Sequence, residues 1–180
     1  MPTAHPNFSH QPQPTVRNGQ RAAWILGLTS LTLLAALAAY LSPLQPDILA
    51  LQFTFDQASF QAILEAWKPE GVLRYRSHLP IDYGLLLCYG AFGYVLASKT
   101  ALFTKFSPLT ERLLLWVMPL AALCDAVENS LHWRFTSGLQ QADSALYLVA
   151  GTSAALKCAL LGVFVVSVLV ALAKPAAARA

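Results

Sequence analysis

The sequence contains few charged residues. Only 12% of its 180 residues are Asp, Glu, Lys or Arg, whereas 56% are hydrophobic. An ordinary soluble domain is roughly 25% charged, because it has to cover its surface with groups that water solvates. This composition excludes an ordinary soluble domain and predicts a protein whose solvent is a lipid bilayer.

Cysteine is also scarce. Cys88, Cys124 and Cys158 fall in separate apolar segments, and no two of them have C-x-x-C spacing. We therefore expect small membrane-buried thiols, without disulfides. The net charge is only +3, and no run of Lys and Arg is dense enough to follow a phosphate backbone, which excludes nucleic acid as a partner.

Recognisable catalytic motifs are missing. The sequence has no G-x-S-x-G elbow, no H-E-x-x-H zinc pair and no P-loop, so neither a reaction class nor a cofactor follows from a motif. His78 and His132, with carboxylates near them, have side chains that suit zinc, iron or haem. They lack the tight spacing of a metal motif, however, and no metal ligands are predicted.

Long apolar segments dominate what is present. Each is close to or above the roughly 20 residues that cross the hydrocarbon core of a bilayer. They predict an all-α membrane protein, a four-transmembrane-helix bundle with spans at about 22–41, 81–98, 113–133 and 145–173. A cleaved signal peptide is the alternative for the first span, but the apolar run is longer than a usual signal and follows a polar stretch.

The first loop is expected to contain a short amphipathic helix. Thr54 to Gln57 have the spacing of a capping box, which predicts a helix over about 55–67. Its apolar stripe would consist of Phe60, Ile63, Leu64 and Trp67, and Pro69 and Gly71 would end it. Pro80 is expected in the first turn of the second span.

The basic residues predict the orientation. One side of a four-span arrangement carries Arg17, Arg21, Lys99, Lys105, Arg112, Lys174 and Arg179, and the other carries Lys68, Arg74, Arg76 and Arg134. The side richer in Lys and Arg is normally cytoplasmic. We therefore expect a plasma (inner) membrane protein with residues 22–174 as its transmembrane domain. A disordered tail at 1–21 and a short tail at 175–180 would both be cytoplasmic, and the loop helix extracytoplasmic.

Ionisable residues inside the spans need a reason, because each costs roughly 2.5 to 3.5 kcal/mol to insert. Four polar residues of the third span share one helix face, since their spacing is i, i+3, i+4 and i+7: Asp125, Glu128, Asn129 and His132. Lys157 enters the fourth span to the same depth as Asp125, roughly 18 Å by the helical rise. An ion pair between Asp125 and Lys157 is expected.

These residues predict a polar cavity that opens to the outer leaflet. His78, Asp82, Glu128 and His132 would lie near its rim, and Arg74, His78 and Asp82 would form a row if the second helix extends back through Pro80. The candidate ligand-binding residues are Arg74, Arg76, His78, Asp82, Asn129 and Lys157. A structural role is the alternative, with Glu128 paired to Arg74 or Arg76.

Two classes of function follow. The first is an accessory or assembly subunit of a larger membrane complex, or a lipid-binding module that uses the polar cavity. The second is an intramembrane enzyme that acts on a lipid or isoprenoid head group, with Glu128, Asp125 and His132 as catalytic acid–base residues. The expected partners are membrane lipid and other membrane-protein subunits or a second copy. Proton-coupled transport is less favoured, because no inverted repeat is visible.

Overall fold

The computed structural model describes residues 14–138 and 143–173, and the regular elements in these ranges are all helices. They are α1 (Pro14–Leu41), α2 (Ile48–Gln52), α3 (Gln57–Lys99), α4 (Pro108–Thr136) and α5 (Ser144–Ala173). Of these, α1, α3, α4 and α5 are long and apolar enough to cross a membrane. The prediction of a helical, multi-pass membrane protein is therefore confirmed.

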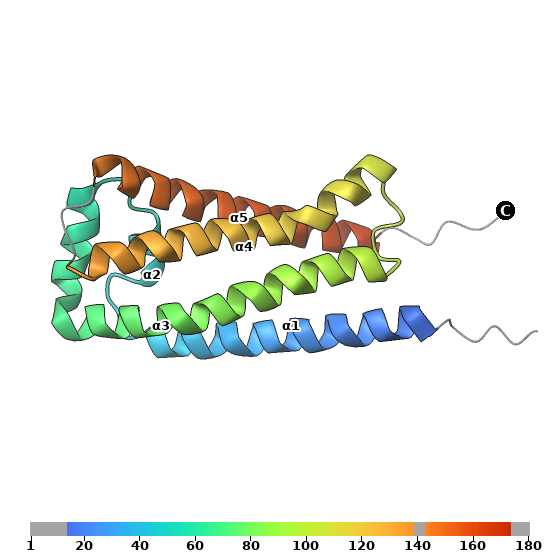
Figure 1. Ribbon diagram of the computed structural model, residues 1–180, viewed down its shortest axis with the longest axis horizontal. Helices are drawn as coiled ribbons and strands as arrows, with labels where there is room; N and C mark the ends of the chain where they lie inside the picture. Colours follow the sequence, from blue (N-terminus) through green and yellow to red (C-terminus); the bar gives the residue numbers. More distant parts are fainter. Residues whose placement is uncertain (1–13, 139–142, 174–180) are drawn as a thin grey trace, which may run out of the picture.

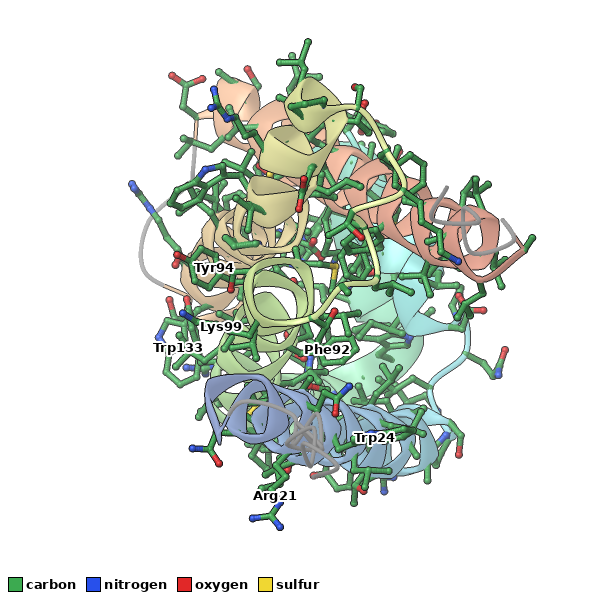
Figure 2. All side chains as sticks on the ribbon, turned by 90° about the vertical axis from the view of Figure 1, so that its right-hand side faces the viewer. Arg21, Trp24, Phe92, Tyr94, Lys99 and Trp133 are labelled. Atoms are coloured by element: carbon green, nitrogen blue, oxygen red, sulfur yellow. The ribbon has the colours of Figure 1, made fainter. Side chains whose placement is uncertain are left out.

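The four long helices form a row in chain order. Helix α3 packs against both α1 and α4, and α4 packs against α3 and α5, whereas α3 and α5 touch at few points. Figure 1 shows that α1 begins and α5 ends at the same end of the molecule. We call it the opposite end, because it lies opposite the bend in α3 at Lys68. Seen from there in Figure 2, Arg21 and the 70% exposed Trp24 project from α1.

Helix α3 changes direction at Lys68. We call this bend the elbow, and the end of the molecule at which it lies the elbow end. Lys68 has φ 57° and ψ 174°, so helical geometry is interrupted there. Figure 1 shows the first part of α3 lying across the end of the other helices. Pro69 explains the position of the break, because a proline disfavours helical backbone at the preceding residue and suits a first helical turn. Residues 57–67 are thus a helical segment of their own before the break, close to the expected bounds of 55–67, and a second helical segment begins at Pro69.

The start of α3 differs from the expected capping box. Asp56 is the N-cap, and its Oδ1 accepts a hydrogen bond from Ser59 N at 2.9 Å. Thr54 donates instead to Leu51 O at 2.7 Å, because its side chain is buried under the preceding turn. The backbone and side-chain hydrogen bonds from Ser59 lower the pKa of the Asp56 carboxyl group.

Two further expectations about helix bounds were wrong. Residues 14–21, expected in a disordered tail, form the first turns of α1, since extending an existing helix costs little. Pro80 lies inside α3 rather than at the start of a span, because the helix restarts at Pro69 and one proline removes only one helical hydrogen bond. The remaining expected tail residues, 1–13 and 175–180, lie outside the described residues.

The half of the molecule toward the opposite end has an apolar core, which we call the apolar half. Its buried members include Ala97, Phe103, Met118, Phe164 and Ala171. Glycine allows α3 and α4 to approach closely here. A Cβ atom at Gly93 would overlap the side chain of Met118, and one at Gly90 would lie 3.0 Å from Ala122 Cβ.

Candidate functional site

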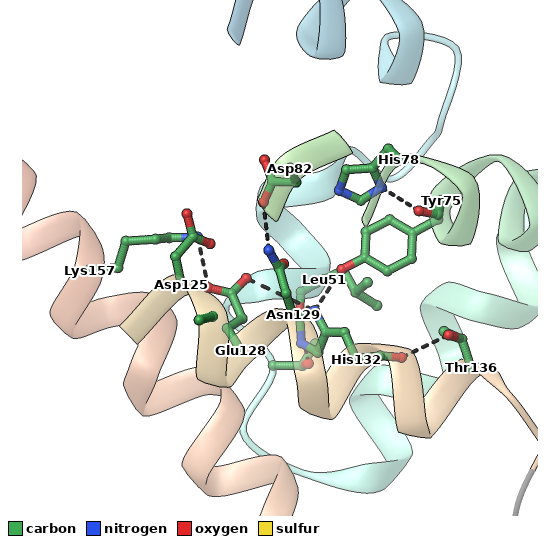
Figure 3. A network of polar contacts seen from close by, with 12 residues as sticks. Leu51, Tyr75, His78, Asp82, Asp125, Glu128, Asn129, His132, Thr136 and Lys157 are labelled. Carbon is green, nitrogen blue, oxygen red and sulfur yellow. Dashed lines mark hydrogen bonds and ion pairs between the residues drawn. The ribbon is translucent and has the colours of Figure 1, made fainter. Parts of the chain in front are cut away.

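The predicted polar face of α4 is buried in the half of the molecule toward the elbow end. There it meets side chains from α3 and α5 in a set of polar contacts that we call the buried network (Figure 3). Its members are Tyr75, Asp82 and Tyr89 of α3, Asp125, Glu128, Asn129 and His132 of α4, and Lys157 of α5. All the α4 members are at most 5% exposed.

Lys157 joins α5 to α4 through two carboxylates. Its Nζ lies 3.0 Å from Asp125 Oδ1 and 2.7 Å from Glu128 Oε2. The predicted pair with Asp125 is therefore present. The second carboxylate was not expected as a partner of Lys157, although it follows from the helix, because residues three apart lie side by side on one face.

The two carboxylates differ in how their oxygens are satisfied. Asp125 accepts hydrogen bonds at both oxygens, from Lys157 at 3.0 Å and from the Tyr89 hydroxyl at 2.9 Å. Glu128 is completely buried, and neither of its oxygens accepts a hydrogen bond of acceptable geometry from any described residue. Lys157 is close enough to Oε2, but its direction makes this contact an ion pair without a well-formed hydrogen bond.

The network continues from Glu128 toward the elbow end. His132 Nδ1 lies 3.9 Å from Glu128 Oε1 and 2.6 Å from the Tyr75 hydroxyl, which forms a hydrogen bond with it. His78 Nδ1 is bonded to the backbone carbonyl of Tyr75. Because the imidazole of His132 is enclosed by aromatic rings, it is held in one orientation.

A second branch reaches a less buried carboxylate. The Asn129 side-chain amide donates to Asp82 Oδ2 at 2.6 Å, which joins α4 to α3. Asp82 is only partly buried, unlike Glu128. Asn129 therefore gives the Asp82 carboxyl group one hydrogen-bond donor from within the protein.

Aromatic side chains close the network at the elbow end. Phe60, from the segment of α3 before the elbow, packs on His132 with ring centroids 5.2 Å apart and on Tyr147 at 5.5 Å. Phe135 stacks on Tyr147 at 4.0 Å. We call Phe60, Phe135 and Tyr147 the aromatic lid.

The prediction that four polar residues form the open rim of a cavity is therefore wrong. His78, Glu128 and His132 are at most 3% exposed, and of the four expected rim residues only Asp82 has substantial exposure. The reason is the elbow, since residues 57–67 fold across the end of the helices and place Phe60 over His132.

The two arginines that were considered as partners of Glu128 contact other groups instead. Arg74 donates to the Tyr40 carbonyl of α1 at 3.0 Å, and its guanidinium lies over the Tyr40 ring. Arg76 lies over the ring of Trp133, 5.1 Å from its centroid. They diverge because α3 is helical here, and residues two apart on a helix point about 200° apart.

Arg76 also lines a groove on the outside of the elbow, which we call the elbow groove. It has a volume of about 590 Å³, and its walls are Leu64, Glu65, Lys68, Pro69, Val72, Leu73 and Arg76. Arg76 Nε is buried and has no hydrogen-bond partner among the described residues. The groove therefore combines an apolar wall with two cations and one carboxylate.

Tyr75 and Tyr89 were missed by the sequence analysis, although a signal for them exists. Tyr75, Asp82 and Tyr89 are seven residues apart, which is close to two helical turns, so all three lie on one face of α3. The signal was not used because the second span was expected to begin only at Pro80.

Among the described residues, no group of three or more His, Cys, Asp and Glu side chains is arranged to hold a metal ion. In comparisons with protein-family models, curated proteins and solved structures, nothing matches this chain.

Proposed function

We propose that this protein is a membrane-embedded lipid-binding module that holds the phosphate head group of a phospholipid in the elbow groove. The observation that carries the proposal is the unpaired Nε atom of Arg76, which is buried in the wall of the groove without a hydrogen-bond partner among the described residues. A guanidinium presents several donors in a planar fork, and a phosphate accepts two of them at once.

The surroundings of Arg76 suit a lipid better than a free anion. Lys68 adds a second cation, and Leu64, Val72 and the 68% exposed Leu73 give an apolar wall for the first part of the acyl chains. Trp133, against which Arg76 lies, is a residue type favoured at membrane interfaces. One carboxylate, Glu65, leaves the groove with a net positive charge.

The depth of the groove is also that of a head group. Residues 69–99 of α3 span about 46 Å at a rise of 1.5 Å per residue. The hydrocarbon core is about 30 Å thick, and the bilayer with its head groups is about 40 to 45 Å. With this helix centred on the bilayer, the hydrocarbon core begins about 8 Å from Pro69, so Arg76, about 10 Å along the helix, lies at the boundary between the core and the head-group layer.

An enzyme that uses Glu128 and His132 is less well supported. Both side chains are at most 1% exposed beneath the aromatic lid, so a substrate would first have to displace Phe60. We therefore propose the elbow groove, and not the buried network, as the binding site.

Native mass spectrometry of the protein, gently extracted from the membranes in which it was made, tests the proposal. We expect a bound anionic phospholipid whose occupancy falls at least several-fold in Arg76→Gln. Arg134→Gln is the matched control, because it removes the same charge from an exposed site on the last turn of α4 outside the groove. Other protein subunits retained at fixed stoichiometry, without lipid, would overturn the proposal in favour of an accessory subunit.

The orientation is tested separately by cysteine labelling in intact cells. Ala58→Cys lies in the first turn of α3 and Ala101→Cys in the loop that follows it, and both side chains are exposed. We expect Ala58→Cys to react with an impermeant reagent and Ala101→Cys to be protected, in a background without the three native cysteines. The reverse pattern would put the elbow groove in the inner leaflet.

A further inference from the structure

The buried network contains more acid than base. Asp125 and Glu128 share the single ammonium group of Lys157, and all three side chains are at most 8% exposed. If both carboxylates were ionised, this group would carry a net negative charge inside the membrane-spanning region. An uncompensated buried carboxylate is so unfavourable that such groups are neutralised by a proton or a cation.

The hydrogen bonds indicate which carboxylate is neutralised. Asp125 accepts a hydrogen bond at each oxygen, from Lys157 and from Tyr89, which is the arrangement that stabilises an ionised carboxylate. Glu128 is fully buried and accepts no well-formed hydrogen bond from the described residues. Its complete burial, with an ion-pair contact to Lys157 at Oε2 and no hydrogen-bond donor at Oε1 among the described residues, favours the neutral acid.

Groups on each of the three packed helices act on Glu128. From α3 come the partly buried Asp82 and the hydroxyl groups of Tyr75 and Tyr89. From α4 come Asp125 and His132, and His78 of α3 lies beyond Tyr75. Lys157 of α5 is the one cation in contact with Glu128 among the described residues. The two aspartates favour protonation of Glu128, and Lys157 opposes it.

A proton fits this place better than a metal cation. Lys157 Nζ already occupies the position between Asp125 Oδ1 and Glu128 Oε2 where a bridging cation would bind. The described His, Cys, Asp and Glu side chains form no set of three that could complete a coordination shell. Protonation, by contrast, needs no additional space.

We propose that Glu128 is a proton-binding site, in which its carboxyl group holds one exchangeable proton beside the ion pair of Asp125 and Lys157. Release of this proton to water leaves a carboxylate that competes with Asp125 for Lys157. His132 Nδ1 lies 3.9 Å from Glu128 Oε1, between Glu128 and the elbow end of the molecule. The ring of Phe60 packs on the imidazole of His132. Exchange with water is therefore controlled by the aromatic lid. The site is separate from the elbow groove and does not depend on lipid binding there.

Infrared spectroscopy of the full chain in lipid nanodiscs tests this site, because a protonated carboxylic acid has a carbonyl stretching band that a carboxylate lacks. We expect this band at neutral pH, a shift of the band in deuterium oxide, and its loss in Glu128→Gln. Glu70→Gln, at an exposed site just after the elbow and outside the lining of the groove, is the matched control and should keep the band. Absence of the band at neutral pH, or its survival in Glu128→Gln, would overturn the proposal.

Two further measurements keep the test decisive. Glutamine has the shape of a protonated glutamate, so Glu128→Gln should fold with an unchanged Tm, whereas a large loss would mean that the native group is ionised. Phe60→Ala should speed deuterium uptake at the carbonyl band at least several-fold. A Tm that rises with sodium at fixed pH, and only when Glu128 is present, would instead make this a cation site.

Discussion

The two halves of the molecule are held together by different physical means. In the apolar half, α3 and α4 approach at Gly93 and Met118, and the contacts are van der Waals contacts between small and aromatic side chains. Toward the elbow end a second apolar cluster, which includes the aromatic lid, is also present, but α3, α4 and α5 are joined in addition by hydrogen bonds and the ion pairs of Lys157. Packing tolerates small changes locally, whereas a polar network fails when one member is removed.

The largest effect is expected from removing the cation. Lys157→Met leaves Asp125 buried with only Tyr89 as partner, and breaking a buried ion pair in this way costs about 3–5 kcal/mol. Unfolding followed by circular dichroism in detergent measures it. A triple variant that adds Asp125→Asn and Glu128→Gln removes the unpaired charge of Asp125, leaves no ionisable carboxyl group beside residue 157, and should recover most of the loss. A triple variant no more stable than Lys157→Met would show that the lysine acts through packing instead.

A smaller effect is expected in the apolar half. Gly93→Ala places a Cβ atom into the side chain of Met118, so α3 and α4 must separate, at a cost of about 1–3 kcal/mol. Gly84→Ala is the control, since no atom lies within 4 Å of the added Cβ. Thermal unfolding should separate the two variants. Equal Tm values would mean that this helix contact is not a tight one.

Replacing Lys68, the residue at the elbow, should increase the stability of the protein slightly, whereas the two changes above decrease it. Lys68→Gly relieves the positive φ and should stabilise the protein by at most about 1 kcal/mol, because glycine also makes the unfolded chain more flexible. Ala66→Gly, two residues earlier in ordinary helix, should destabilise it by a similar amount. Denaturant titration compares them. A loss of stability in both would indicate that the backbone at Lys68 is not strained.

The smallest effect concerns the cap of α3. The hydrogen bonds from Ser59 lower the pKa of Asp56 in the folded state, so its contribution is complete above the unfolded pKa and is lost as the pH falls through the folded pKa. Asp56→Asn keeps a capping oxygen but cannot titrate. The wild type should therefore lose slightly more Tm than this variant on acidification. Parallel curves would show that Asp56 contributes nothing to the pH dependence.

The features that sequence predicted best are those that the bilayer constrains. The hydrocarbon core has no water to hydrogen-bond backbone N–H and C=O groups, so a long apolar segment that crosses it satisfies these groups by forming a helix. The fixed rise of a helix then gives depth, which is why Asp125 and Lys157 could be paired without knowing which helices are neighbours. The shared face of Asp125, Glu128 and His132 followed in the same way.

The features that were predicted wrongly depend on the backbone conformation of one residue and on which helices pack against each other. The elbow at Lys68 carries Phe60 over His132, and nothing in the apolar pattern gives the direction of that turn. The same elbow extends α3 back past Pro80, which sends Arg74 toward α1 and Arg76 toward Trp133. The network that was expected to be open is therefore closed, and Arg76, whose Nε has no hydrogen-bond partner among the described residues, lines a groove outside the network.

The central claim is that the elbow end, and not the opposite end, holds a phospholipid head group. Photo-crosslinking with a phospholipid that carries a diazirine in its head group, followed by peptide mapping, tests it most directly. The account predicts adducts within residues 64–76, which line the elbow groove, and their loss in Arg76→Gln. Adducts concentrated instead around the basic residues Lys99 and Arg112 of the opposite end, unchanged by Arg76→Gln, would contradict it.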